Sequence, residues 1–542
     1  MLQQKGLPTA SLLDIEARTP PRPVPRVGGG PVALAMGKPS RRGIALRIFA
    51  TVWLVYGMHL ATDVVRETYL ALALGDHLSI RVDEYLGLHP DLFEMAGRGA
   101  YINNNPGASM LGALPYAAAR PFMAVLFKAK PELVRPKPPT TYADPRPNRS
   151  KFTNLARARG LDIKLGLAAG FIQIGLMAPL GALAALAVFL FLRRRLGDER
   201  KATWLALLYA FGTPIFFRSA FLNQNAIVAH CVLFAYMLAV GSEPRPEGAP
   251  PAMPSLGRLA AIGALLGLGI LCDYSAVPLA VAFGVWLMWR AGAAARAVAR
   301  LGPTPVGGKG AARGPGAAVE AAARTGLVYV AGAALPIAVL LGYQYAAFGN
   351  PLFPAQHYMP TTDLSVRGWN GVALPIPELL WRNLLDPRYG LLVFAPMLLA
   401  APAALWLKRR EGGPTSSELW LAFGATAALY LFCSSIEFAL LQWNTGVRYM
   451  VPAAPLLFFA LVPVLLRLPR WALWSLVLPT LVISWSVAMA RESVPMSLAL
   501  IFLRGFQLPW LEVLHKTAGG YLPFLSGGAS PLPIFCLVGV VL

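Results

Sequence analysis

Long apolar runs separated by short polar segments dominate the sequence. A helix needs about 20 mainly apolar residues to cross the roughly 30 Å hydrocarbon core of a bilayer. Runs near that length lie at 44–62, 164–192, 202–217, 226–241, 257–272, 275–290, 326–346, 391–408, 419–436, 450–466 and 471–489. A further run, 523–542, is weaker because it contains Pro531 and Pro533. The pattern predicts an all-α polytopic membrane protein with about 11–12 transmembrane helices.

Composition agrees with this prediction. Of the 542 residues, 56% are hydrophobic and 14% are charged, whereas soluble domains have a charged share of about 25%. The mean hydropathy is +0.54. The formal net charge of +22 comes from basic residues in the gaps between apolar runs, so we expect no nucleic-acid partner. The four cysteines lie in or beside apolar segments and are interpreted as core residues.

Basic clusters assign the two sides of the predicted helices. "RRGIALR" precedes the first run, "RRRLGDERK" starts at 193 and "KRREGG" at 408, and each is expected to face the cytoplasm. One crossing must then lie between the first run and the cluster at 193, and the run 164–192 takes that place. The stretch 107–127 is therefore predicted to be an amphipathic helix at the outer interface. The first outer loop becomes 63–163. Its second half is basic, which by itself would favour the cytoplasmic side, but the preference of basic residues for that side is weak in loops longer than about 60 residues.

Three sections follow from these assignments. Residues 1–43 are rich in Pro, Gly and Arg and lack the short apolar core of a signal peptide, which predicts a disordered basic cytoplasmic tail. Residues 44–490 form the predicted membrane module, with a Gly/Ala/Arg-rich cytoplasmic linker at 291–325. Residues 491–542 form a C-terminal region with a possible last transmembrane helix.

Unusual polar residues concentrate in the predicted outer loops. Asp63 and Glu67 lie one helical turn apart just past the first run, and the same loop continues with Asp91 and "GRGAYINNNPGASMLGALPYA". Later outer loops contain "FGNPLFPAQHYMP", "LLDPRYGLLVFAP" and "EFALLQWNTGVRYMVPAAP". A charge at mid-bilayer costs about 2.5–3.5 kcal/mol on insertion scales, whereas an ion at the interface stays hydrated. Acids at a helix end that face basic and aromatic residues of other loops fit a site for an anionic, sugar-bearing substrate.

In these features the chain resembles the polyprenol-dependent glycosyltransferases of the GT-C fold, which include the protein O-mannosyltransferases and the lipid A aminoarabinose transferase. The resemblance implies a GT-C type membrane fold and inverting transfer of a single sugar. The implied donor is a polyprenyl-phosphate sugar, and the implied acceptor is an extracytoplasmic glycolipid, polysaccharide or protein. In that family a carboxylate of the first outer loop acts as the general base. Carried over, the base is Asp63 or Glu67, and the sequence leaves both open.

The leaving phosphate develops negative charge that an Arg can hold bidentately. Arg448 is the first choice, with Arg388 and Arg367 behind it. Many relatives have a Lys at or just before the proline of the interfacial segment, where this chain has Asn103, Asn104 and Asn105. Either Arg98 supplies the charge, or donor binding differs, or turnover has been lost. The remaining predicted substrate-binding residues are Asp91, Tyr101, Asn105, His357, Trp443, Asn444 and Tyr449.

Other readings make different predictions. Asp63, Asp91, Glu94 and His357 could converge on a metal ion, but no ligand spacing requires one, so we predict neither metal nor cofactor. A polysaccharide ligase or polymerase would be expected to have its largest outer loop late in the chain, whereas here that loop is the first. A transporter would typically have internal repeats, and none is clear. The Ala-, Gly-, Pro- and Arg-rich composition suggests a bacterial inner (plasma) membrane, with the site on its extracytoplasmic side.

Overall fold

The chain is mainly helical, as the sequence predicts. The computed structural model describes residues 41–61, 64–139, 149–243, 253–300, 315–361, 366–408, 413–444, 446–518 and 530–541. Within these residues the only sheet is an antiparallel hairpin of β1 (Leu92–Met95) and β2 (Gly99–Ile102). Residues 1–40 of the predicted disordered tail, residues 301–314 of the predicted cytoplasmic linker and Asp63 lie outside the described residues. The predicted all-α class is confirmed.

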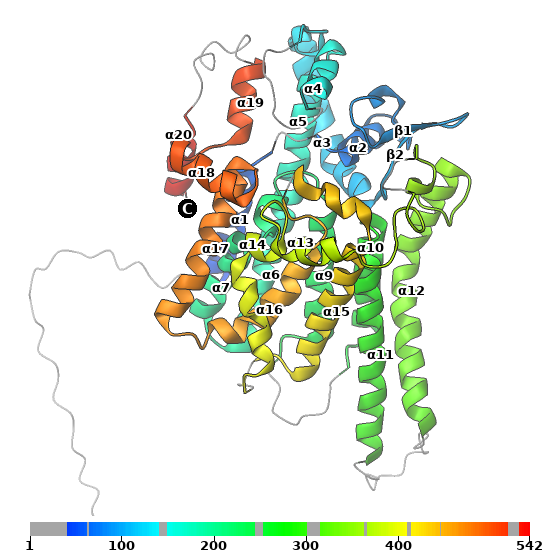
Figure 1. Ribbon diagram of the computed structural model, residues 1–542, viewed down its shortest axis with the longest axis vertical. Helices are drawn as coiled ribbons and strands as arrows, with labels where there is room; N and C mark the ends of the chain where they lie inside the picture. The colour runs from blue at the N-terminus through cyan, green and yellow to red at the C-terminus, as the bar shows by residue number, and fades with distance from the viewer. Residues whose placement is uncertain are drawn as a thin grey trace, which may run out of the picture.

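Long helices packed side by side form the body of the molecule (Figure 1). They are α1 (Arg41–Met58), α5 (Asp162–Ile172), α6 (Ala178–Leu196), α7 (Glu199–Gly212), α9 (Gln224–Val240), α10 (Leu256–Cys272), α11 (Ala276–Arg300), α12 (Pro315–Phe348), α15 (Ser416–Ser434), α16 (Ala454–Leu465) and α17 (Arg470–Ala490). In the described part of the chain, six helices are long and apolar enough to cross a membrane, or seven if one bent pair counts as a single span. Six further apolar helices are shorter. This helix content indicates an integral membrane protein, while the higher span count stays a prediction.

The run 164–192 forms one uninterrupted apolar helical segment. A π-helical turn at Gln173–Met177 joins α5 to α6, and the combined segment Asp162–Leu196 qualifies as a single span. The Gln173 side chain is buried at this turn, where its Nε2 donates to the Tyr56 oxygen at 2.8 Å and to the Ser219 oxygen at 3.3 Å. The helix therefore fits the single crossing that the sequence predicts for this run.

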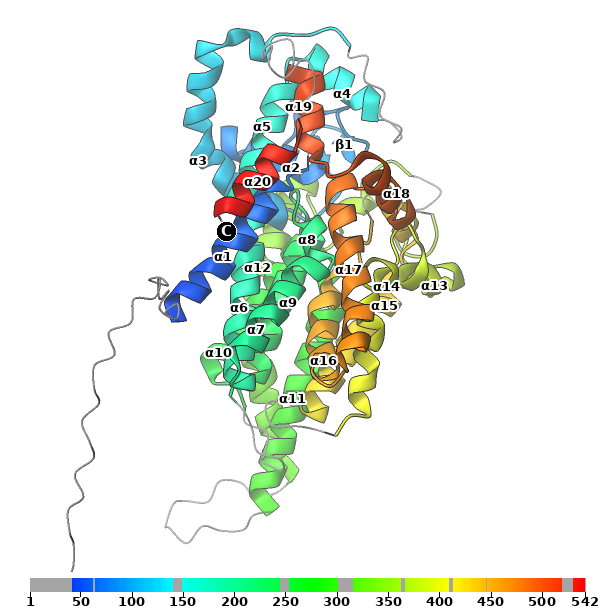
Figure 2. The ribbon, with the colours of Figure 1, turned by 90° about the vertical axis from the view of Figure 1, so that its left-hand side faces the viewer.

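Further helices lie towards the upper end of the bundle (Figures 1 and 2). They include α2 (Arg66–His77), α3 (Gly107–Ala129), α4 (Arg149–Ala158), α13 (Pro377–Leu385), α18 (Val494–Arg504), α19 (Pro509–Ala518) and α20 (Leu532–Val541). Helix α3 contains the predicted interfacial helix 107–127, but it is also one of the six helices that could span a membrane. Its interfacial placement therefore stays a prediction.

Proline positions account for two departures from the predicted helices. The run 391–408 divides into the short α14 (Leu391–Phe394) and a 3₁₀ segment, Pro396–Leu405, which contains Pro402. Proline lacks a backbone N–H and clashes with the preceding helical turn, so this apolar run does not form one α-helix. In the weak last run, only Leu532–Val541 is described as helix, and it begins directly after Pro531. Helices α18 and α19 have no counterpart among the predicted runs.

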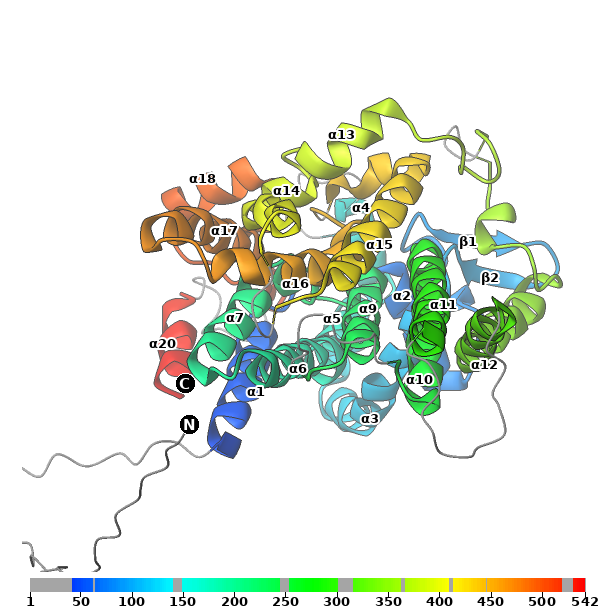
Figure 3. The same ribbon diagram turned by 90° about the horizontal axis from the view of Figure 1, so that it is seen from below.

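Helices α10 and α12 approach each other through glycines. A Cβ atom added at Gly263 would lie 1.9 Å from the Tyr329 carbonyl oxygen, and one added at Gly332 would lie 2.0 Å from the Ala260 carbonyl oxygen. Figure 3 shows α10, α11 and α12 as neighbours in a view from below. Small residues allow such backbone contact between membrane helices. The glycines are therefore required by the close packing of this pair.

We expect Gly263→Ala to lower the thermal stability of the purified protein, because the new methyl group must push two helix backbones apart. Overpacking of this kind costs about 1–3 kcal/mol. Gly257→Ala is the matched control, because it lies on the same helix and a Cβ there has no heavy atom within 4 Å. Thermal unfolding in detergent measures both variants. Equal melting temperatures for the two would contradict the packing account.

Candidate functional site

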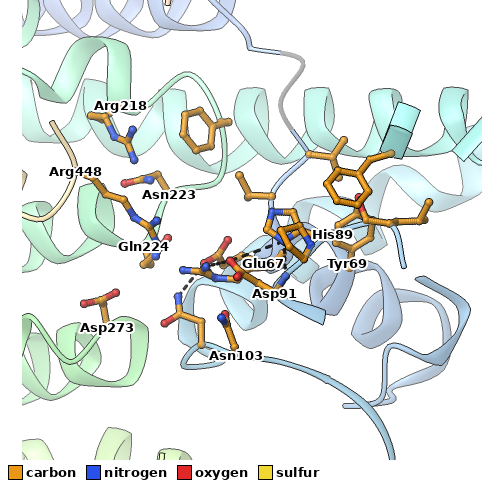
Figure 4. A pocket seen from close by; sticks show the side chains of 18 of the residues that line it. Glu67, Tyr69, His89, Asp91, Asn103, Arg218, Asn223, Gln224, Asp273 and Arg448 are labelled. Carbon is orange, nitrogen blue, oxygen red and sulfur yellow. Dashed lines mark hydrogen bonds and ion pairs between the residues drawn. The ribbon is translucent and has the colours of Figure 1, made fainter. Parts of the chain in front are cut away.

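A cavity of about 1250 Å³ lies at the end of the bundle where α2, the start of α9 and several loops meet. Figure 4 shows the polar part of its wall. The labelled side chains come from segments far apart in the sequence, including Glu67, Asp91, Gln224, Asp273 and Arg448. The cavity therefore joins Glu67 to Gln224, which follows it by 157 residues, and to Arg448, which follows it by 381 residues.

Helix α2 places a buried carboxylate in the cavity wall. The backbone is extended at Val65 and turns helical at Arg66, so Glu67 lies in the first turn, where an acid is favoured by the helix dipole. Glu67 is 2% exposed. Its Oε1 accepts hydrogen bonds from Arg66 Nε at 3.1 Å and from Asn104 Nδ2 at 2.8 Å. No described residue hydrogen-bonds Glu67 Oε2.

Arg66 connects Glu67 to Asp91, which the sequence analysis includes in the substrate-binding set. Arg66 forms ion pairs with both carboxylates. Burial disfavours a charged Asp91, but Arg66, with His89 and Arg448, outweighs this effect and holds the pKa of Asp91 below its ordinary value. Burial lowers the pKa of His89, so that side chain is neutral near pH 7. Its Nδ1 accepts the Asp91 N–H at 3.1 Å, which assigns the ring proton to Nε2.

The three residues "NQN" at the start of α9 have three different contacts. Asn223 caps the helix, with its Oδ1 accepting from the Ala226 N–H at 2.9 Å. The Gln224 amide lies between an acid and a cation. The neighbours assign its orientation, because the reverse one would set acceptor against acceptor at Glu67 and donor against donor at Arg448. In the assigned orientation its nitrogen donates to Glu67 Oε1 at 3.1 Å, and its oxygen accepts from Arg448 Nη2 at 2.8 Å. Asn225 Oδ1 accepts from Arg448 Nε at 3.3 Å.

Besides Arg66, two more arginines, Arg218 and Arg448, line the same cavity as Glu67. Arg448 donates hydrogen bonds to the amide oxygens of Gln224 and Asn225, which help to orient its guanidinium. Arg448 also lies 5.1 Å from the centre of the Tyr449 ring. Arg218 is buried and lies 5.1 Å from the centre of the Phe221 ring. The cavity wall can therefore present guanidinium groups to an anion.

The wall formed by α5 and α19 is apolar. Leu167 and Phe171 of α5 line the cavity, and so do Val513 and Leu514 of α19. Trp510 also lines it, and its indole Nε1 donates to the Met58 oxygen at 2.9 Å, which fixes α19 against the end of α1. One cavity thus combines a charged and amide-rich wall with an apolar wall.

Four of the predicted site residues line the cavity: Glu67, Asp91, Arg448 and Tyr449. Asp63, the other candidate base, lies outside the described residues, as do the side chains of Trp443 and Asn444. Asp273 Oδ1 accepts the Ser275 N–H at 2.8 Å, and this residue also lines the cavity.

The structure places three other predicted residues in contacts away from the cavity wall. The Arg388 guanidinium pairs with Asp386 at 3.0 Å. Arg367 Nη1 lies 2.8 Å from Glu437 Oε1 and its side chain is 71% exposed. His357 stacks on Phe353 with 4.6 Å between the ring centres. None of the three predicted residues belongs to the cavity lining.

The remaining predicted residues lie near β2 and the start of α3. Arg98 is exposed, and the Tyr101 hydroxyl donates to the Arg98 carbonyl oxygen at 3.1 Å. Asn105 Nδ2 donates to the Ile270 carbonyl oxygen at 2.7 Å, which ties the start of α3 to the end of α10. These three side chains do not line the cavity. Of the Asn103–Asn105 stretch, it is Asn104 that contacts Glu67.

Sequence reasoning missed Arg66, His89, Asn104, Arg218 and Gln224 as lining residues of the cavity. The available signal was the stretch "NQN", three amides placed directly before an apolar run. In the described part of the chain, no group of three or more His, Cys, Asp or Glu side chains could hold a metal ion. Asp63 is outside that part, so the predicted absence of a metal stays a prediction.

Comparison with known proteins gave one structural match. No protein-family model and no curated protein matches the sequence. The fold is similar to the crystal structure of ArnT from Cupriavidus metallidurans bound to undecaprenyl phosphate, with a TM-score of 0.47 and 14% sequence identity. The match covers 90% of this chain and 72% of that chain. Identity at this level does not transfer residues or chemistry from one chain to the other.

Proposed function

We propose that this protein is a membrane glycosyltransferase that moves one sugar from a polyprenyl-phosphate donor to an extracytoplasmic acceptor. The observation that carries the proposal is the two-sided cavity. Its arginines and amides suit a phosphate and sugar hydroxyls, and the apolar wall of α5 and α19 suits a hydrocarbon chain. A ligand with an anionic sugar-bearing head and a lipid tail has both features.

The proposed reaction is a direct displacement at the anomeric carbon. The acceptor oxygen or nitrogen bonds to that carbon, while the carbon–oxygen bond to phosphate breaks and its electron pair stays on the phosphate. The acceptor proton moves to a carboxylate. We assign this role to Glu67, since its Oε1 is held by donors and no described residue hydrogen-bonds its Oε2. General-base catalysis requires such an acceptor within hydrogen-bond reach.

Asp63 remains the second candidate base, because it precedes Glu67 by only four residues in the sequence. Arg448, with Arg218 beside it in the cavity lining, is the proposed ligand of the leaving phosphate. A guanidinium suits this task because its parallel N–H groups match phosphate oxygens. The sugar, the acceptor and the extracytoplasmic placement belong to the same proposal.

The test is binding and turnover with the purified full-length protein in lipid nanodiscs. The probes are radiolabelled polyprenyl-phosphate monosaccharides of several sugar types, and a cell-envelope extract supplies glycolipid, polysaccharide and protein acceptors. The proposal expects saturable donor binding and label transferred to one acceptor class. Absence of donor binding across the panel overturns it. Sugar flux in proteoliposomes without transfer would instead identify a transporter.

A further inference from the structure

We propose that Gln224 is a positioning residue that fixes the Glu67 carboxylate and the Arg448 guanidinium relative to each other. The inference rests on the proposed function, in which these two groups act as proton acceptor and phosphate ligand. It adds that the positions of Glu67 and Arg448 depend on each other, because the Gln224 amide contacts both side chains.

The amide has one contact on each side. Gln224 nitrogen lies 3.1 Å from Glu67 Oε1, and Gln224 oxygen lies 2.8 Å from Arg448 Nη2. The same oxygen lies 3.1 Å from Asn104 Nδ2, which also donates to Glu67 Oε1 at 2.8 Å. The Gln224 residue is 2% exposed. Water therefore has little access to the amide, and its orientation is set by these neighbours.

A primary amide satisfies both neighbours, because it has N–H donors on one side and a carbonyl acceptor on the other. A glutamate at this position would place a second carboxylate against Glu67. A lysine or arginine would place a second cation against Arg448. A leucine would leave both groups with one fewer hydrogen bond in a buried setting, which costs more than in water.

The backbone around Gln224 is held rigidly by the helix start. The Asn223 side chain caps α9, and Gln224 is the first residue of that helix. Asn225 follows directly and reaches Arg448 Nε. Two successive amides thus contact two different nitrogens of one guanidinium, but only Gln224 also contacts Glu67. This difference between neighbours gives the experiment its comparison.

Chemical labelling tests the coupling without requiring turnover. A hydrophobic carbodiimide probes the reactivity of Glu67, phenylglyoxal probes Arg448, and mass spectrometry measures both rates in the full-length protein in nanodiscs. We expect Gln224→Leu to change the labelling rate at both residues. Asn225→Leu should change it at Arg448 alone. A change at only one residue in Gln224→Leu, or at neither, overturns the inference.

Gln173→Leu is the matched control for loss of a buried amide. Gln173 is also buried, and its Nε2 donates to two carbonyl oxygens of other segments, but it is outside the cavity lining. We expect this variant to lose thermal stability while the Glu67 and Arg448 labelling rates stay as in wild type. Altered labelling in Gln173→Leu would mean that the probes report general loosening, and would count against the inference.

Turnover adds a second readout once a donor is identified. Gln224→Leu should lower kcat by roughly 10- to 100-fold, the scale expected when a reacting group is misplaced by about 1 Å, and should weaken donor binding as well. Asn225→Leu should affect donor affinity more than kcat. If Gln224→Leu changes labelling at both residues but the wild-type protein transfers no sugar, the inference stands and the proposed function is overturned. If the wild-type protein transfers sugar but Gln224→Leu does not change labelling at both residues, the proposed function stands and the inference is overturned.

Discussion

Glu67→Gln is expected to abolish most sugar transfer while donor binding is retained. Glutamine has the shape of glutamate, so an amide oxygen in the place of Oε1 still accepts from Arg66 and Asn104. In the place of Oε2 it has an NH₂ group, which donates hydrogen bonds and cannot take up the proton that the attacking sugar acceptor loses. Loss of a general base lowers the rate by about 10²- to 10⁴-fold. Single-turnover transfer at saturating donor measures the effect.

Two further variants make this result specific. Glu94→Gln removes an exposed acid from β1 of the same loop, outside the cavity lining, and should transfer sugar at the wild-type rate. Asp63→Asn separates the two candidate bases that the sequence leaves open. Full activity in Glu67→Gln together with inactive Asp63→Asn would assign the base to Asp63 and leave Glu67 a positioning role.

The sequence predicted the helical body well, because apolar runs of membrane length have few alternative structures. The prediction failed where an apolar run contains prolines, which an α-helix interior does not tolerate. The run 391–408 is therefore divided into two short segments. The prediction also missed α18 and α19, since short amphipathic helices contain no run of 20 apolar residues. The omission matters for the cavity, because α19 supplies part of its apolar wall.

For the site, the sequence located groups whose chemistry is conspicuous. Glu67 and Arg448 are charges next to apolar runs, and both line the cavity. Gln224 escaped notice because an amide before an apolar helix has an ordinary explanation as a cap, a role that Asn223 in fact has. The sequence also does not reveal that the Arg388 guanidinium pairs with the buried Asp386. Arg388 lies outside the cavity lining, and its substrate-binding role stays a prediction.

Arg448→Met is expected to weaken binding of the polyprenyl-phosphate donor. The substitution keeps an unbranched apolar side chain beside Tyr449 but removes the guanidinium that Gln224 and Asn225 orient. A hydrogen bond to a charged group contributes about 1.5–3 kcal/mol, which corresponds to roughly a 10- to 150-fold increase in the donor Kd. Filter binding of labelled donor to the protein in nanodiscs measures it.

Three comparisons locate the cause of that loss. Arg448→Lys should bind with intermediate affinity, because an ammonium keeps the charge but lacks the paired N–H groups that match phosphate. Arg388→Met should leave the donor Kd unchanged, since Arg388 is outside the cavity lining. Raising the salt concentration should narrow the difference between wild type and Arg448→Met, because screening weakens the attraction that the substitution removes. Wild-type donor affinity in Arg448→Met would mean that Arg448 is not the phosphate ligand. Arg218, another arginine of the cavity lining, would then be the next residue to replace.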